Sequence, residues 1–354
     1  MKKTRILAVF CAIVGVLMIT LFLYYQYQLL PADKTSKADI EVIIPSGMTT
    51  DSIATILEKK GLIKSKTFFK VYLKLNHVTS LKASTYTLKK NMSLNKIVEQ
   101  LEKGNTYNAN AVNLTFQEGK TITDYATLIE SKTAISKAEF LAKMKDETYI
   151  RTLIDSYWFL TEDILNPDIY YPLEGYLAPD TYEFINQQVS IEEIVKKLLD
   201  QEEKNLEKNK QTLQAKNIHQ TLTLASITEL EGVTSSDRKK IVGVFQNRLA
   251  KGMNLGSDVT TYYAFQQTMD KDLTSTMFNT YNPYNTRSEK MAGKLPVGPI
   301  CNPSKESIEA TLHPTASDNL YFVADKNGKV YYTKTQQEHN AKVKELKENG
   351  DWIW

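Results

Sequence analysis

The stretch Ile40–Gly61, IEVIIPSGMTTDSIATILEKKG, contains the unit from which the first part of this fold is built. Its apolar opening, Ile40–Ile44, predicts a β-strand, and the glycine that follows predicts a tight turn. Thr49 is a residue type favoured at helix N-caps, and Ile53 and Leu57 behind it stand at helical spacing. The stretch therefore predicts a strand, a turn and a short amphipathic helix.

The same pattern recurs along the chain, and this weak repeat is the main clue to its organisation. Each copy opens with Gly or Asn, has Thr or Ser two residues on, and continues with an apolar stripe at helical spacing. The copies are Gly47–Gly61, Asn91–Gly104 and Gly119–Lys132, and strand-like runs precede them at Ile40–Ile44, Thr85–Leu88 and Val112–Phe116. The repeat predicts an α+β fold.

A second helix is expected directly after the first copy of the repeat. Gly61 ends the first helix, and Ser65 can cap another that carries Phe68, Phe69 and Leu73. The resulting order over Ile40–Leu88, strand–helix–helix–strand, resembles the LysM fold, a small glycan-binding module. We therefore expect a LysM-like α+β module at residues 38–104. The alternative is an α+β adaptor that binds no glycan.

A hydrophobic run near the N-terminus predicts a membrane-spanning helix. Ile6–Leu23 is apolar apart from Thr20, and a bilayer core requires about 20 such residues. Three basic residues precede the run, so the positive-inside rule predicts a cytoplasmic N-terminus. We expect a cytoplasmic tip at residues 1–5, a transmembrane helix at 6–27, a linker at 28–37, and the rest of the chain outside a bacterial cell membrane. A cleaved signal peptide is the alternative.

The remaining residues, 105–354, predict a larger mixed α+β domain. Helices are expected from Ser190 to about Lys208, from near Gln220, and from a cap at Ser236 to Gly252. A hairpin is expected from Tyr321–Ala324 and Val330–Tyr332, followed by a polar helix that includes Glu338, His339 and Asn340.

Bulk composition excludes some classes of function. The 354 residues are 42% hydrophobic and 24% charged, as in ordinary globular proteins. A net charge of +3 gives no sign of a nucleic-acid partner. Of the two cysteines, Cys11 lies in the hydrophobic N-terminal run and Cys301 lies far downstream, so they do not suggest a disulfide-based fold.

The residue types available for catalysis favour carboxylates. The four histidines are scattered and form no metal-ligand motif, so neither a metal nor another cofactor is expected. Neither a nucleophile elbow nor a phosphate-binding loop is present. Carboxylates set among aromatic residues remain, and this composition is typical of carbohydrate-cleaving sites.

Glu229 is the sharpest candidate, in the segment Leu222–Gly232, LTLASITELEG. Read as a helix, the segment places Leu222, Ala225 and Ser226 on the same face as Glu229. A carboxyl on such a face loses solvation, which raises its pKa and suits a general acid. The alternative is a structural glutamate at the edge of the core, paired with a nearby Lys or Arg.

Several blocks of sequence together resemble the YceG-like family, the membrane-anchored endolytic murein transglycosylases. They are Glu174–Tyr182 (EGYLAPDTY), Ala225–Glu231 (ASITELE), Val244–Leu249 (VFQNRL) with Gly252 and Met253, Leu255–Thr260 (LGSDVT), Tyr284–Thr286 (YNT) with Leu295–Pro303 (LPVGPICNP), and Leu312–Pro314 (LHP) with Leu320–Ala324 (LYFVA) and Glu338–Asn340 (EHN). The blocks span nearly the whole chain in the same order.

The resemblance implies a lyase that cleaves between N-acetylmuramic acid and N-acetylglucosamine in nascent glycan strands and leaves 1,6-anhydro ends. Its catalytic glutamate corresponds to Glu229, acting as acid and then as base. Candidate substrate-binding residues are the aromatic residues Tyr176, Tyr182 and Tyr284 and the polar residues Glu174, Arg248, Asp258, Asn285 and Asn302. Packing of the tyrosines and a helix-fixing role for Arg248 are the alternatives.

This chain departs from the family pattern at a few positions, and other functions stay open. Leu230 and Gly232 stand where the family commonly has Lys and Thr, Gly256 where it has Gln, and Ser84 where it has Gly. The alternatives are a two-carboxylate muramidase that pairs Glu229 with Asp258, and a non-catalytic peptidoglycan-binding scaffold. Expected partners are glycan strands and the membrane, and an association with cell-wall synthases is a hypothesis.

Overall fold

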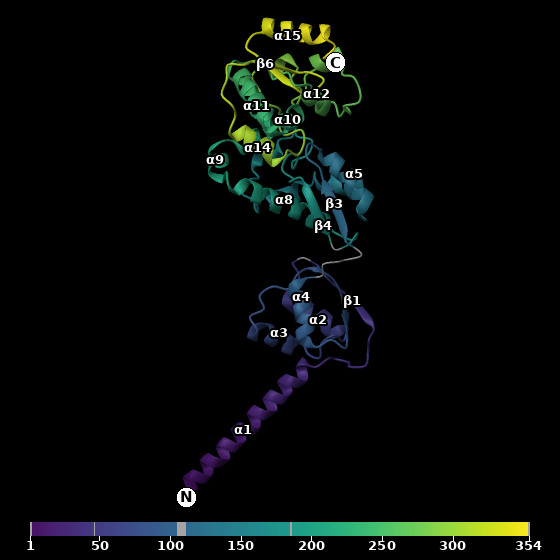
Figure 1. Ribbon diagram of the computed structural model, residues 1–354, viewed down its shortest axis with the longest axis vertical. Coiled ribbons are helices and arrows are strands. Elements are labelled where there is room, and N and C mark those ends of the chain that lie inside the picture. The colour runs from purple at the N-terminus through teal and green to yellow at the C-terminus, as the bar shows by residue number, and fades with distance from the viewer. Residues whose placement is uncertain (1, 46, 105–110, 185, 353–354) are drawn as a thin grey trace. The chain divides into compact units, whose positions relative to one another are not determined.

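The computed structural model describes residues 2–45, 47–104, 111–184 and 186–352. It divides into two compact units (Figure 1). One comprises Met1–Val112 and Glu183–Gln187, and the other comprises Asn113–Tyr182 and Gln188–Trp354. The core of the second unit holds the site described below.

The N-terminal helix α1 (Lys2–Leu29) corrects the prediction of a membrane anchor. Among the residues that the structure describes, no helix is both long and apolar enough to cross a membrane. The transmembrane helix at residues 6–27 and the single-pass orientation built on it are therefore wrong, and the fold class is a mixed helix-and-sheet fold.

The first unit has the predicted order strand–helix–helix–strand. The elements are β1 (Asp39–Ile44), α2 (Thr50–Lys59), α3 (Lys66–Leu75) and β2 (Ser84–Lys89), followed by α4 (Leu94–Lys103). The two strands pair antiparallel with Val42 opposite Tyr86, and both side chains point into the core. The expected N-caps are confirmed, since Thr49, Ser65 and Ser93 each accept a backbone N–H in the first helical turn. The likeness of this module to LysM and its binding of glycan both stay predictions.

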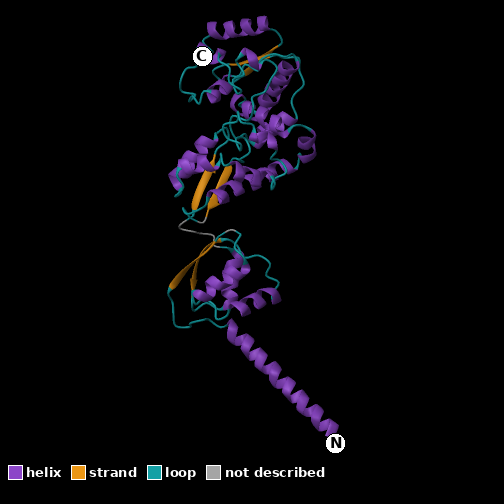
Figure 2. Ribbon diagram, turned by 180° about the vertical axis from the view of Figure 1, so that it is seen from behind, coloured by secondary structure: helices purple, strands orange, loops and turns teal. Residues whose placement is uncertain are grey.

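The second unit begins within β3 (Val112–Phe116), which pairs with β4 (Asp180–Phe184) (Figure 2). Between them lie α5 (Ile122–Lys132), α6 (Lys137–Lys143), α7 (Glu147–Ile154) and the 3-10 helix η1 (Glu162–Leu165). After β4 come α8 (Ile191–Glu207), α9 (Lys210–Ala215), α10 (Ile218–Glu231), α11 (Ser235–Ala250), α12 (Asp258–Ala264), α13 (Ser275–Asn279), the 3-10 helix η2 (Glu289–Met291) and α14 (Lys305–Leu312). The cap of α11 is Thr234, two residues before the predicted Ser236.

Helix α10 forms the centre of this unit and contacts α11, α12 and α14. Its residues 221–228 are buried all round. Four of them, Thr221, Thr223, Ser226 and Thr228, are polar, and their hydroxyls donate to carbonyls of the helix or of its N-cap Asn217. A helix buried on every side must satisfy its polar groups internally, and α10 does so up to the turn that carries Glu229.

The C-terminal part contains the predicted hairpin, β5 (Tyr321–Ala324) and β6 (Val330–Thr333), paired antiparallel. The last helix, α15 (Gln336–Glu348), packs on both strands.

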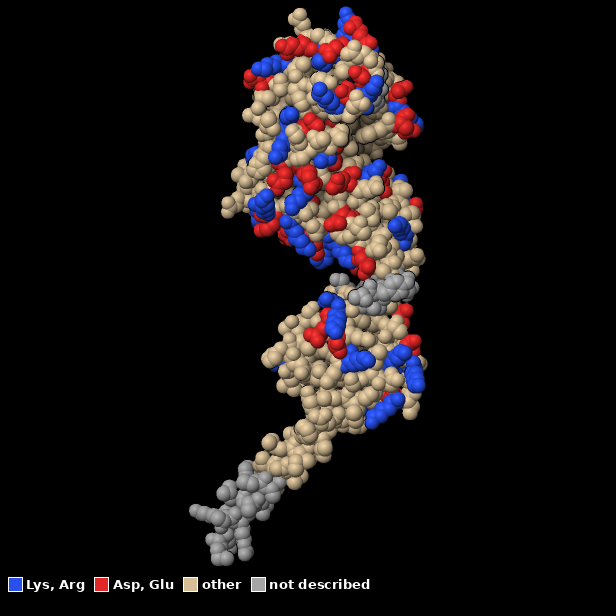
Figure 3. Space-filling model, in the orientation of Figure 1, with Lys and Arg blue, Asp and Glu red and all other residues tan. Residues whose placement is uncertain are grey.

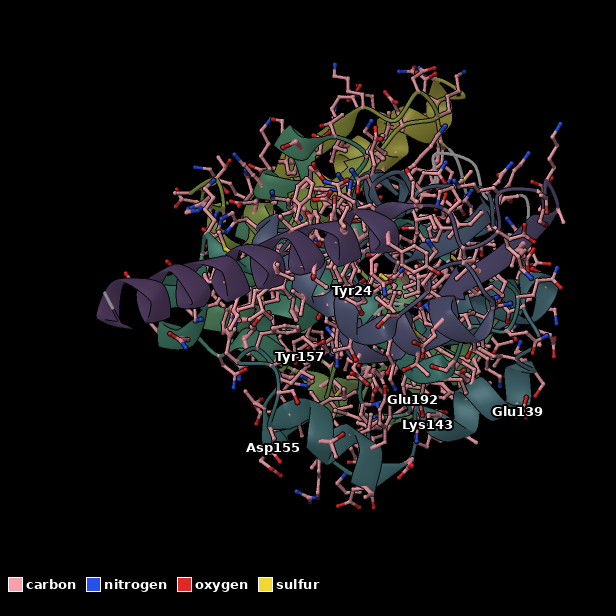
Figure 4. The ribbon with its side chains drawn as sticks, turned by 90° about the horizontal axis from the view of Figure 1, so that it is seen from below. Tyr24, Glu139, Lys143, Asp155, Tyr157 and Glu192 are labelled. Carbon is pink, nitrogen blue, oxygen red and sulfur yellow. The ribbon has the colours of Figure 1, made fainter. Side chains whose placement is uncertain are left out.

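Charged groups on the surface of the second unit are mixed in sign (Figure 3). Among the exposed ion pairs, Lys143 of α6 and Glu192 of α8, 3.3 Å apart, connect two helices (Figure 4). Exposed pairs of this kind stabilise by at most about 1 kcal/mol, so the fold depends mainly on its buried core.

Glu202 in α8 is an ionisable group inside that core and predicts a pH dependence of stability. It is 2% exposed, and burial raises its pKa to about 8 from 4.5. Only Asn205 donates to it, at 3.4 Å, and its Oε1 has no partner among the described residues. The unfolded chain ionises first as the pH rises, so the free energy of unfolding falls between about pH 4.5 and 8.

We expect Glu202→Gln, which cannot ionise, to lessen this decline and to raise the free energy of unfolding at pH 8 by roughly 1–3 kcal/mol. Denaturant unfolding at several pH values measures this free energy. Glu207→Gln, on the exposed end of the same helix, is the control and should keep the full decline. The same pH dependence in Glu202→Gln as in the unsubstituted protein would contradict the prediction.

Candidate active site

A cleft of about 530 Å³ opens in the second unit at the C-terminal end of α10. Three segments line most of it: residues 118–121, which precede α5; Glu229 and Leu230 of α10; and residues 262–269, at the end of α12 and beyond. It combines carboxyl, amide and aromatic side chains with apolar ones, a combination suited to a sugar chain.

Glu229 forms part of the cleft wall, and both of its carboxyl oxygens have partners. Arg238 of α11 donates to Oε1 at 3.0 Å. The backbone N–H of Ser304 and its hydroxyl donate to Oε2 at 2.8 and 2.5 Å. The side chain of Glu229 is 6% exposed. The carboxyl is therefore held in one orientation at the edge of the cleft.

The alternative interpretation of Glu229, a structural glutamate paired with a Lys or Arg, also predicts an ion pair such as the one with Arg238. The pair nevertheless lies where Glu229 lines the cleft. Gly232 allows the arginine to approach, because a Cβ at this position would lie 2.5 Å from the Arg238 Cγ. The glycine that departs from the family pattern thus gives Arg238 its room.

Glu174 and Asn302 form a buried frame behind the cleft. Glu174 accepts hydrogen bonds from the Ile122 N–H at 2.9 Å and the Tyr263 hydroxyl at 3.1 Å. Asn302 donates to Glu174 at 3.3 Å and to the Lys120 carbonyl at 3.1 Å. Burial raises the pKa of Glu174 to about 8 although the hydrogen bonds from Ile122 and Tyr263 oppose this rise. Both side chains are fully buried and hydrogen-bond to the backbone of residues 120–122, so they position the cleft wall.

The three tyrosines singled out from the sequence lie outside the cleft lining. Tyr176 and Tyr284 are 0% exposed. The Tyr176 hydroxyl is 2.8 Å from Nδ1 of His219, and Tyr284 packs its ring on Tyr263 at 4.8 Å. Tyr182 is half-buried, and its hydroxyl donates to the Ala178 carbonyl at 2.9 Å. Each of these rings packs within the protein.

The other polar candidates also bind within the protein. Arg248 donates to the carbonyls of Leu320 and Leu255. Asp258 pairs with Arg287 at 2.5 Å. Asn285 is buried and donates to three backbone carbonyls, at residues 277, 278 and 280. None of the three candidates is among the residues that line the described cleft.

Several residues that were not singled out from the sequence line the cleft, among them Tyr262, Glu118 and Asp124, whose carboxylate accepts hydrogen bonds from Thr121. Tyr262 presents its ring there, and its hydroxyl donates to the Lys271 carbonyl at 2.9 Å. Glu118 provides a second carboxyl, whose pKa is raised by partial burial and then by the charges of Glu229 and Glu306. The available signals were weak: Tyr262 stands one helical turn after Asp258, and Glu118 lies just before the cap of α5.

Comparisons with known proteins agree on one family. The YceG-like family matches residues 42–345. An endolytic murein transglycosylase of Bacillus subtilis (strain 168) is 40% identical over 327 residues, which cover 92% of this chain and 89% of that protein. One from Streptococcus pneumoniae serotype 2 (strain D39) is 38% identical over 342 residues, 91% of this chain and 61% of that protein. The crystal structure of a yceG-like protein from Listeria monocytogenes matches with a TM-score of 0.61 and 39% identity, covering 86% of this chain and 99% of that one. The chain belongs to the YceG-like family.

Proposed function

We propose that this chain cleaves the bond between N-acetylmuramic acid and N-acetylglucosamine within peptidoglycan strands and leaves 1,6-anhydro ends, with Glu229 as acid and then base. The enzyme class rests on relationship: the chain is an endolytic peptidoglycan transglycosylase, a lyase, as are relatives named so at about 40% identity. The observation that supports the acid is the placement of the Glu229 carboxyl, fixed by Arg238 and Ser304 on the wall of the cleft.

The reaction needs one group that gives a proton and takes one back. Glu229 in its acid form protonates the glycosidic oxygen, and the bond from that oxygen to the anomeric carbon breaks. The Glu229 carboxylate then removes the proton from the 6-hydroxyl of the same muramoyl sugar, whose oxygen bonds to the anomeric carbon. No water is consumed, and Glu229 regains its proton. Positioned proton transfer of this kind supplies on the order of 10² to 10⁴ in rate.

Ser304 is suited to both forms of Glu229. A hydroxyl can donate to a carboxylate and accept from a carboxylic acid, and the Ser304 hydroxyl lies 2.5 Å from Oε2. The Ser307 N–H donates to the same hydroxyl at 3.2 Å and fixes its position. The hydroxyl can therefore reverse its role within one reaction cycle while the backbone N–H of Ser304 stays in place.

A two-carboxylate hydrolase is the second candidate, and one observation favours it. Glu118 lines the same cleft and interacts electrostatically with Glu229. Asp258, the partner first considered, is paired with Arg287 and does not line the cleft. The products distinguish the two reactions, because a hydrolase leaves free reducing ends and a lyase leaves anhydro ends.

The predicted association with cell-wall synthases and the glycan binding of the LysM-like module remain separate hypotheses. Co-purification tests the first. Binding of intact strands by the full chain, with and without substitutions in residues 38–104, tests the second.

Glu229→Gln should lower the rate of strand cleavage by about 10² to 10⁴, because the amide cannot deliver the proton. Digestion of purified glycan strands by the full chain, followed by mass spectrometry of the ends, measures both rate and product. Glu207→Gln, an exposed glutamate on α8, is the matched control and should cleave normally. Equal digestion by Glu229→Gln and the unsubstituted protein would show that the acid is another residue.

Tyr262→Ala should raise KM for long strands by about 3- to 10-fold, because it removes an aromatic surface on which a sugar ring can stack. Tyr262→Phe keeps the ring and loses only the hydrogen bond to Lys271, so it should stay near the original KM. Steady-state kinetics on strands of defined length measure both. If Tyr262→Ala leaves KM unchanged, the ring does not contact substrate.

A further inference from the structure

Two hollows of the second unit meet at one residue, Glu118. The first is the cleft that contains Glu229. The second is an open groove of about 490 Å³, lined by residues 115–118 at the end of β3 and 179–181 at the start of β4. Of the residues that the structure describes, Glu118 alone lines both. A polymer that passes Glu229 and continues into the groove must therefore pass this side chain.

The carboxyl of Glu118 is available for a ligand. Within the part of the chain that the structure describes, it makes no hydrogen bond and no ion pair. The carboxyl of Glu229, in contrast, has three donors. The two acids thus differ in kind, since one is fixed by protein partners and the other faces open space.

The backbone beside Glu118 holds the carboxyl near Glu229. Gly119 donates its N–H to the Asn302 carbonyl at 2.9 Å, and the Asn302 N–H donates to the Lys120 carbonyl at 3.0 Å. Gly119 has a φ of +70°, and a Cβ there would lie 3.2 Å from Leu230 and 3.7 Å from Glu229. Only glycine readily combines this backbone conformation with so close an approach to α10.

The groove beyond Glu118 has the chemistry of a saccharide subsite. Thr115 and Thr181 lie opposite each other there, with their hydroxyls 3.0 Å apart. Gln117 and Asp180 add an amide and a carboxylate on the same surface. Short polar side chains of this type can donate to and accept from sugar hydroxyls.

We propose that Glu118 is a second substrate-contacting carboxyl of this enzyme, which holds the sugar between the cleft and the groove, so that the glycan strand occupies both hollows. This inference rests on the proposed function, because it assumes that the strand is cleaved at Glu229. A strand bound on both sides of the acid is cleaved internally. Glu118 lies where the cleft meets the groove. Its charge also acts on the acid across the cleft.

The test compares Glu118→Gln, Glu118→Ala and Glu306→Gln in the full chain. Glu306 is exposed in the first turn of α14 and contributes its charge near Glu118 without lining either hollow. Glu306→Gln therefore controls for loss of a nearby charge. Rates are measured on long strands and on short oligosaccharides over a range of pH, and melting temperatures confirm that each variant folds.

Glu118→Ala should lower kcat/KM on long strands by about 10-fold, because it removes a hydrogen bond to substrate, and it should affect the short oligosaccharides less. Glu118→Gln keeps a side chain that can hydrogen-bond to a sugar hydroxyl, so it should lower kcat/KM on long strands less than Glu118→Ala does. Glu306→Gln should leave the strand-length dependence unchanged.

Strand binding gives a readout that is independent of catalysis. In a Glu229→Gln background, adding Glu118→Ala should weaken binding of uncleaved long strands by about 10-fold. If Glu118→Ala matches the unsubstituted protein in strand-length dependence and in strand binding, the inference is overturned. If Glu229→Gln itself stays active, the proposed function fails instead.

Discussion

The buried amide of Asn302 is the contact on which the cleft depends. Its Oδ1 accepts two backbone N–H groups from residues 175–177, and its Nδ2 donates to the Lys120 carbonyl. An unpaired buried amide would cost about 1–3 kcal/mol for each group left unsatisfied, so this position requires that segments far apart in the sequence meet. Glu118 lies two residues before Lys120, and Ser304 lies two residues after Asn302. One amide therefore places both the free carboxyl and the donor that fixes Glu229.

Helix ends then set the electrostatics around Glu229. The carboxyl lies in the last turn of α10, where the helix dipole presents its negative end. Ser304, the N-cap of α14, directs its backbone N–H at the same carboxyl, and Arg238 adds a positive charge on the other oxygen. On the open side stands Glu118, which is negative when ionised. The Glu229 carboxyl thus lies between a positively charged partner, Arg238, and a second carboxyl, Glu118.

Local sequence patterns predicted the helices and strands well. Contacts between segments far apart in the chain could not be predicted from these patterns. The caps Thr49, Ser65 and Ser93 follow from hydrogen bonds within one turn, so the sequence is sufficient. Tyr176 and Tyr262 both stand in segments rich in aromatic residues, but one is buried in the core and the other lines the cleft. That difference depends on packing between segments far apart in the chain. The membrane anchor was predicted from hydropathy and flanking charge, without any tertiary contact, and the structure does not support it.

The lining of the cleft bears on why a sugar hydroxyl, rather than water, would attack. Beside Glu229 the wall contains Leu230, Val259, Ile300 and Met269. A bound strand covers such apolar groups and displaces water from them, which leaves few positions from which a water molecule could reach the anomeric carbon. The 6-hydroxyl belongs to the reacting sugar itself, and intramolecular attack has an effective concentration far above that of a free molecule. Under the proposed mechanism, with Glu229 as the one fixed acid, a partly apolar cleft would favour ring closure over hydrolysis, even with a second carboxyl nearby.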